Sequence, residues 1–198
     1  MSIAPFVEGT ETYRRWLQQA IVYALSMTVA GATTGSIFAL AGAGVSALWS
    51  DARVPLAAVL GAIALAYSLH ELGVLQLRVP GRDWIVPAEW VRHGFYRSAV
   101  TWGTLVGFGV FTRVPFAALP VLAAWLFISG NVLYGLTAGA VYGATRAASI
   151  YASASSREVT DLVQINQLVM RLAGPGHLAT GLFLAAFGAY LLAAPHLP

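Results

Sequence analysis

WLQQAIVYALSMTVAGATTGSIFALAGAGVSALWS, residues 16–50, runs between Arg15 and Asp51 without one formally charged side chain. About 20 apolar residues are enough to cross the hydrocarbon core of a bilayer as a helix. The run therefore predicts a first membrane-spanning helix at about residues 18–49. It is longer than one crossing needs, so the sequence leaves open one tilted or projecting helix, or two helices divided near Gly31–Gly35.

The composition of the whole chain predicts the same environment. Of its 198 residues, 58% are hydrophobic and 10% are charged, whereas a soluble domain has about 25% charged residues. So few charges do not coat a water-facing surface of this size, and lipid covers the outside of a membrane protein instead. We therefore expect an all-α, polytopic membrane helix bundle with the lipid bilayer as its partner.

Hydrophobic runs along the chain predict about five transmembrane helices in a single transmembrane domain, residues 1–198. The predicted spans are about 18–49, 54–77, 98–128, 132–152 and 177–194. Two short interfacial helices complete the predicted bundle. One is opened by Pro87 in the connection rich in arginine and tryptophan, and the other runs from about Ser155 to Arg171, before the breaking triplet Gly174-Pro175-Gly176.

Arginine placement predicts the orientation. With the N-terminus in the cytoplasm, eight arginines lie on the inner side of the predicted spans and one, Arg53, on the outer side. Because cytoplasmic loops carry an excess of basic residues, we expect an odd number of spans with the C-terminus outside. All 11 basic residues are arginine, which is typical of GC-rich coding DNA, with a functional use of arginine as the alternative. The chain also resembles small membrane proteins of high-GC bacteria, and this resemblance implies the inner (plasma) membrane of a bacterial cell as its location.

Several classes of function are disfavoured by what the sequence lacks. It has no cysteine, which rules out disulfides, thiolate metal ligands and thiol redox chemistry. His70 and Glu71 are adjacent and point about 100° apart on a helix, so they do not converge on one ion. No serine lies in a nucleophile elbow, and no glycine-rich phosphate loop follows a strand. We therefore expect no enzyme, catalytic residue, metal, cofactor or nucleic-acid partner.

Glycines recur every four residues in three of the predicted spans, which places them along one face of each helix. This spacing predicts close helix packing, with a substrate path along the glycine face as the alternative. The glycines are Gly31 and Gly35, then Gly103 and Gly107, then Gly135, Gly139 and Gly143.

Arg113 is the residue that most strongly suggests a site. It lies well inside the third predicted span, where a charge costs about 2.5–3.5 kcal/mol and normally faces a partner or a water-filled cavity. Pro115 and Pro120 follow it, and each removes a backbone donor from a helix. A broken helix beside a buried charge is how many transporters build a midplane site. We predict a substrate-binding site of Thr112, Arg113, Pro115 and Pro120, with a structural ion pair or a snorkelling arginine as the alternative.

Glu71 is the one carboxylate well inside a predicted span. Arg146, in the inner half of the fourth span, lies at a similar predicted depth. The sequence therefore predicts an ion pair between Glu71 and Arg146, unless both side chains simply reach the inner interface.

Three further stretches resemble the membrane family of cytochrome c biogenesis and thiol–disulfide carriers. They are the glycine-rich entry to the proline-broken helix, Gly107–Pro120, the small-residue helix Gly135–Gly143, and the closing helix Gly181–Leu192, which is similar to Val59–Tyr67. The resemblance implies two inverted three-helix halves with one N-terminal helix missing and the C-terminus outside. The redox cysteines of that family are absent, so the resemblance implies the scaffold without electron or disulfide transfer.

Two functions follow as hypotheses. The first is a small transporter or permease-like protein with its site at the proline-broken third helix, where Arg113 attracts an anion or fixes a carboxylate. The second is a non-catalytic accessory or assembly subunit of a larger membrane complex. A chain of this size is expected to work as a homo-oligomer or with other membrane subunits. A polar cavity favours the first hypothesis, and an exposed helix face covered by partners favours the second.

Overall fold

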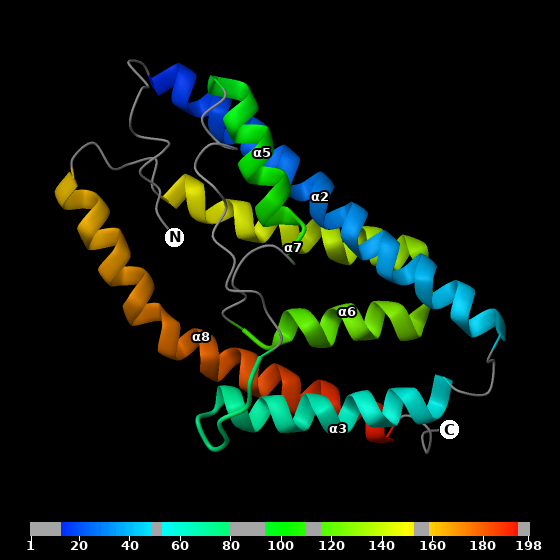
Figure 1. Ribbon diagram of the computed structural model, residues 1–198. Coiled ribbons are helices and arrows are strands. Elements are labelled where there is room, and N and C mark those ends of the chain that lie inside the picture. Colours follow the sequence, from blue (N-terminus) through cyan, green and yellow to red (C-terminus); the bar gives the residue numbers. More distant parts are fainter. Residues whose placement is uncertain (1–12, 49–52, 80–93, 110–115, 153–158, 194–198) are drawn as a thin grey trace.

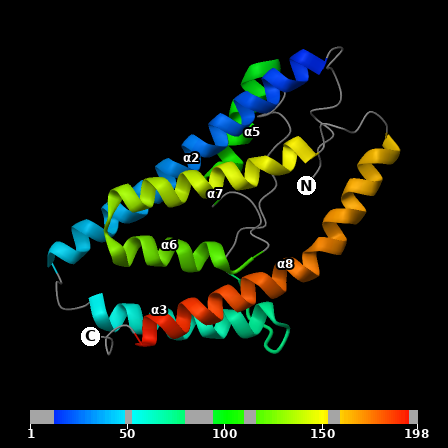
Figure 2. The same cartoon turned by 180° about the vertical axis from the view of Figure 1, so that it is seen from behind.

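The computed structural model describes residues 13–48, 53–79, 94–109, 116–152 and 159–193. Within these ranges every regular element is a helix, which confirms the all-α prediction for this part of the chain. The helices are α2 (Tyr13–Leu48), α3 (Arg53–Glu71), α5 (Phe95–Gly107), α6 (Ala118–Ser129), α7 (Val132–Ala152) and α8 (Val159–Ala193). Figures 1 and 2 show α6 between one group made of α2, α5 and α7 and a pair made of α3 and α8.

In the part of the chain that the structure describes, three helices are long and apolar enough to cross a membrane. The segments are Leu17–Ser46 in α2, Val54–Glu71 in α3 and Met170–Ala193 in α8. α6 is apolar but shorter, with 12 residues. These three helices fit an integral membrane protein, and the finer count of five crossings stays a prediction.

The structure of α2 shows whether the first hydrophobic run, residues 16–50, forms one helix or two. It is one continuous helix of 36 residues, which corresponds to about 54 Å at 1.5 Å per residue. The hydrocarbon core of a bilayer is about 30 Å thick, so α2 is long enough to cross with a strong tilt or to project beyond the membrane. The helix continues through Gly31 and Gly35, whose role is packing.

Glycines bring the backbones of α2 and α7 into contact, and the two helices run antiparallel. A β-carbon added at Gly31 would lie 2.3 Å from the carbonyl oxygen of Gly139, and one added at Gly35 would lie 2.1 Å from that of Gly135. The reverse additions, at Gly139 and Gly135, would meet the same two α2 residues at 2.1 and 2.5 Å. The predicted close packing of these glycine faces is therefore confirmed.

A second antiparallel pair joins α3 and α8. A β-carbon at Gly61 would meet the Gly188 carbonyl oxygen at 3.0 Å, and one at Gly188 would meet the Gly61 oxygen at 2.7 Å. Leu192 flanks the first glycine and Leu65 flanks the second. The contact is thus reciprocal, as in the α2–α7 pair.

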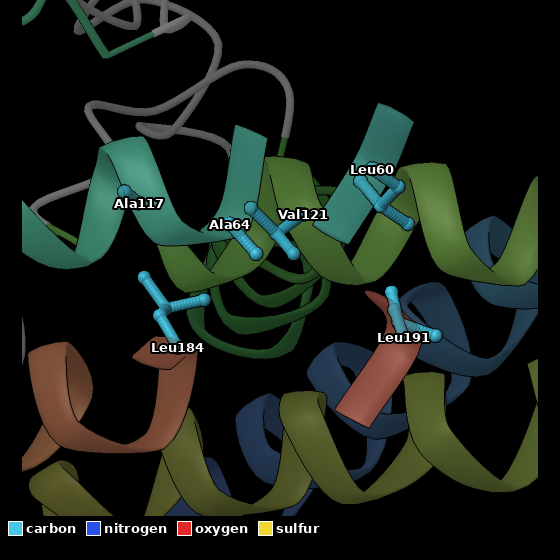
Figure 3. Packing of buried hydrophobic residues seen from close by; sticks show 6 residues of the cluster. All are labelled: Leu60, Ala64, Ala117, Val121, Leu184 and Leu191. Carbon is cyan, nitrogen blue, oxygen red and sulfur yellow. The ribbon is translucent and has the colours of Figure 1, made fainter. Parts of the chain in front are cut away.

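The largest buried cluster ties α6 to the α3–α8 pair. It contains Leu60, Ala64, Ala117, Val121, Leu184 and Leu191. Figure 3 shows side chains of α3, α6 and α8 directed towards a shared interior. α6 therefore holds the second helix pair through apolar packing at its first two turns.

α3 ends earlier than predicted, at Glu71 rather than near residue 77. Gly73 has φ 77°, a left-handed conformation that ends the helix at little cost for glycine. The backbone N–H of Leu77 then donates to Nδ1 of His70 at 3.1 Å. The residues after Glu71 are apolar but not helical, which is why hydropathy alone overextended this span.

The break predicted at Gly174-Pro175-Gly176 is absent, because α8 is one helix of 35 residues that contains Pro175. A proline is tolerated inside a membrane helix where neighbouring groups compensate for the lost hydrogen bond. The second predicted interfacial helix is therefore the first part of α8 and not a separate element. Pro87, the predicted start of the other one, lies outside the described residues, as does Ser155, the predicted start of the second.

Candidate functional site

The predicted third span, residues 98–128, is two helices rather than one. α5 ends within this span and α6 begins further along it. Phe108 and Gly109 after α5, and Phe116 and Ala117 before α6, are not helical, so an interruption of the third span is present in the structure. Thr112, Arg113 and Pro115 lie outside the described residues, so their predicted role in a substrate-binding site stays a prediction.

Pro120 does not break a helix. It is the third residue of α6, and the first four backbone N–H groups of a helix have no partner within that helix. Proline is therefore accepted in this first turn. Pro120 therefore lies at the start of the helix that follows the interruption, and its predicted role in a substrate-binding site stays a prediction.

The observed end of α5 depends on Gly109. Its φ is 69°, and its N–H donates to the carbonyl oxygen of Val106 at 3.2 Å. Glycine adopts this left-handed conformation without the steric cost of a β-carbon. A β-carbon there would also lie 3.0 Å from Leu119 and 3.2 Å from the Tyr142 hydroxyl. Gly109 thus ends α5 and lets that end approach the start of α6.

An apolar cavity of about 720 Å³ opens at this interruption. Both sides of the break contribute to its wall, with Gly107, Phe108 and Gly109 on one side and Leu119 and Pro120 on the other. Further residues of α6, together with α2, α3 and α7, supply the rest of the wall. The volume lies within the range of about 300–1,000 Å³ that is usual for small-molecule sites.

Two hydroxyl groups in the cavity wall already have hydrogen-bond partners. Thr34 donates to the carbonyl oxygen of Ala30 at 2.9 Å. The Tyr142 hydroxyl accepts a hydrogen bond from the guanidinium of Arg146, whose Cζ also lies 5.8 Å from the Tyr142 ring centroid. The Thr34 hydroxyl thus has an acceptor, and the Tyr142 oxygen has a donor. The described wall therefore offers mainly dispersion contacts and volume, which suit an apolar chain.

A polar cluster lies where α3, α6 and α8 meet. One carboxylate oxygen of Glu71 accepts a hydrogen bond from the backbone N–H of Ala117 at 2.6 Å. The other oxygen lies 2.5 Å from Nδ1 of His177. The Glu71 side chain is 1% exposed and that of His177 is 43% exposed. A carboxylate buried this deeply needs such partners, because an unpaired charge there would be very costly.

Aromatic packing holds the His177 ring in place. Its centroid lies 4.8 Å from that of Phe116, with the rings tilted by 56°. Gly176 leaves room for this contact, since a β-carbon there would lie 3.3 Å from the Phe116 ring. Phe116 lies just before α6, so the start of α6 contacts the imidazole as well as the carboxylate.

The predicted ion pair between Glu71 and Arg146 is replaced by a different pairing. Glu71 pairs with His177, whereas Arg146 binds the Tyr142 hydroxyl on its own helix. Depth along a predicted span does not say which face of a helix carries a residue. α3 packs against α8 and α6, and α7 packs against α2, so these two side chains belong to different contacts.

Metal binding finds no support in the part of the chain that the structure describes. No group of three or more His, Asp or Glu side chains there is close enough to hold an ion. The Glu71 and His177 pair supplies two such groups and no third.

His177 was missed as a site residue because it begins the last predicted span and was treated as a helix end. A usable signal was present in its position within an apolar run. An ionisable side chain in such a run normally has a partner, and Glu71 is the one carboxylate in the other spans. The assignment needed the α3–α8 contact, which no single helix reveals.

Three comparisons with known proteins found no relative of this chain. No protein family, curated protein sequence or solved structure matches it. The resemblance to the cytochrome c biogenesis and thiol–disulfide carrier family therefore stays a prediction.

Proposed function

We propose that this chain is a small permease-like membrane protein that binds an apolar or amphipathic molecule in the cavity at the interrupted third span. One observation carries the proposal. The end of α5 and the start of α6 both line a cavity of about 720 Å³. An interrupted membrane helix beside a cavity is the arrangement that many transporters use for binding.

The chemistry of the wall supports an apolar substrate rather than a polar one. Leu122 and Phe127 of α6 and Phe38 of α2 face the cavity, and the hydroxyls of Thr34 and Tyr142 are engaged. A hydrocarbon chain therefore fits the described wall better than a sugar or an ion. In this proposal Arg113 holds the anionic end of an amphipathic substrate, as the sequence predicts.

The directions of the helices support five crossings. α2 and α7 run antiparallel, as do α3 and α8, and α5 and α6 follow one another along α2 in its own direction (Figure 1). In the proposed topology α5 and α6 together form the third crossing. The N-terminus is then cytoplasmic and the C-terminus outside, in the inner membrane of a bacterial cell.

Lipid movement in vesicles tests the proposal. The purified chain is reconstituted with a phospholipid that carries a fluorescent nitrobenzoxadiazole group on one acyl chain, and dithionite then quenches the label in the outer leaflet. We expect the wild type to speed the loss of the protected inner-leaflet signal. Ala123→Trp fills the cavity wall and should abolish this effect. Val141→Trp, on an α7 residue that is 61% exposed, is the matched control and should not.

A second measurement separates binding from movement. A phospholipid with a photoreactive diazirine on its acyl chain should crosslink to α6 in the wild type and less in Ala123→Trp. Crosslinking without faster movement would favour the alternative, an accessory subunit that holds lipid within a larger complex. If the phospholipid is neither crosslinked nor moved faster, that result would contradict the proposed binding site.

A further inference from the structure

The pair of Glu71 and His177 lies outside the cavity wall and has no part in the function proposed above. The Glu71 carboxylate is almost completely buried, and the imidazole of His177 is nearly half exposed. Ionisable groups within membrane proteins are rare and often mark ion or proton pathways. A buried acceptor joined to an exposed, titratable ring is therefore a candidate for a proton site.

The hydrogen bonds of Glu71 and His177 make this pair better suited to bind a proton than a metal ion. Both carboxylate oxygens are engaged, one by the Ala117 N–H and the other by Nδ1 of His177. A metal ion would need further ligands, and the described residues supply no third one. A proton needs only a lone pair, and the ring nitrogen Nε2 of His177 offers one when Nδ1 carries the hydrogen.

The pair lies at one end of the apolar segment of α3. Glu71 is the last residue of the candidate span Val54–Glu71, so the pair lies near the edge of an apolar segment and not at its centre. The 43% exposure of His177 leaves much of its side chain uncovered. We place proton exchange at this uncovered part of the side chain.

The helices around the pair contribute few other titratable groups in the described ranges. α6 carries none between Ala118 and Ser129. On α3, the Tyr67 hydroxyl donates to the carbonyl oxygen of Arg78, and Nδ1 of His70 accepts the Leu77 N–H. On α8, Arg171 is exposed and lies six residues before the pair's imidazole.

We propose that Glu71 and His177 form a proton-binding site that ties α3 and α8 to the start of α6. An incoming proton bonds to the lone pair of Nε2 on His177, and the Nδ1–H remains directed at Glu71. The net charge of the pair rises from −1 to 0. The bond to Glu71 then becomes an imidazolium–carboxylate contact, which is stronger than its neutral counterpart. Proton uptake thus tightens the contact between α3 and α8.

Infrared spectroscopy tests this directly, because the carboxylate stretching band of Glu71 reports the charge of its partner. The band is identified by its loss in Glu71→Gln. In wild-type protein in vesicles, the band is recorded at a pH of about 8 and at a pH of about 5, and proton uptake at Nε2 should shift it. His177→Asn keeps an N–H near the position of Nδ1 but has no Nε2, so the shift should be lost. His70→Asn changes the neighbouring histidine and should retain the shift.

A band that does not move in the wild type would overturn the proposal, as would a shift that persists in His177→Asn. If His177→Asn does not fold, nitrogen NMR of wild-type protein labelled in histidine decides the same point. One imidazole should keep its Nδ1 hydrogen-bonded at both pH values while its Nε2 gains a proton at the lower one. The absence of such an imidazole would also overturn the proposal. None of these outcomes depends on the cavity or its substrate.

Discussion

The carboxylate of Glu71 accepts a hydrogen bond from the backbone N–H of Ala117, at 2.6 Å, and so joins the end of α3 to the beginning of α6. A carboxylate at the C-terminus of its own helix is disfavoured by the helix dipole, whereas the N-terminus of another helix attracts it. α6 has no cap from the side chain of its own N-cap residue. Glu71 therefore serves as the cap of α6 from a different helix.

Loss of this cap should destabilise the protein. Glu71→Ala leaves the buried N–H of Ala117 without its partner, and a hydrogen bond to a charged group contributes about 1.5–3 kcal/mol. We expect the free energy of unfolding to fall by about that amount, measured by thermal or denaturant unfolding in detergent. Glu71→Gln keeps an acceptor oxygen and should lose less. A Glu71→Ala protein as stable as the wild type would mean that the cap contributes nothing.

The glycine contact between α2 and α7 predicts opposite effects of one methyl group at two positions. Gly139→Ala places a β-carbon 2.1 Å from the carbonyl oxygen of Gly31, and such overpacking costs about 1–3 kcal/mol. Gly44→Ala, in α2, meets nothing within 4 Å and should gain about 0.5–1 kcal/mol from helix propensity. Melting temperatures in detergent compare the two. Equal shifts would show that the α2–α7 contact is not close.

The end of α5 predicts a difference between two glycines with positive φ. Gly109→Ala adds backbone strain of about 1–2 kcal/mol and also crowds Leu119 and Tyr142. Gly73→Ala adds similar strain in open space. Unfolding experiments should therefore find Gly109→Ala the more destabilising. The reverse order would argue against the observed approach of α5 to α6.

The role of Arg113 is tested by Arg113→Leu, which replaces the charged side chain with an apolar one. If the arginine holds the anionic end of a substrate, the variant should fold normally and lose crosslinking to the photoreactive phospholipid. If it is a structural tie, the folded protein itself should be lost, as size-exclusion chromatography would show. A folded variant with undiminished crosslinking would exclude Arg113 from the binding site.

The absence of native cysteines makes the predicted topology directly measurable. Arg82→Cys and Ser156→Cys should react with a membrane-impermeant maleimide only when it is supplied from the cytoplasmic side, because the arginine bias places both inside. Pro198→Cys should react only from the opposite side. Reaction of Ser156→Cys and Pro198→Cys from the same side would contradict an odd number of crossings after residue 156.

Hydrophobic length and residue spacing were enough to predict the all-helical fold and the boundaries of α7, which agree with the predicted fourth span. They also identified the glycine faces of α2 and α7. These features are local, because a helix of about 20 apolar residues and a four-residue repeat are properties of one segment. Local signals failed at the C-terminal end of α3 and at Pro175, where turn geometry and neighbouring helices decide whether a helix continues.

Tertiary structure alone decided which polar groups meet. Glu71 and His177 are 106 residues apart in the chain, and the α3–α8 contact through Gly61 and Gly188 brings their helices together. Residue depth along a span suggested Arg146 as the partner of Glu71, but depth carries no information about the face on which a side chain lies. The sequence determined that a buried carboxylate needs a partner, since an unpaired charge in an apolar interior is too costly. The packing of the helices determined that this partner is His177.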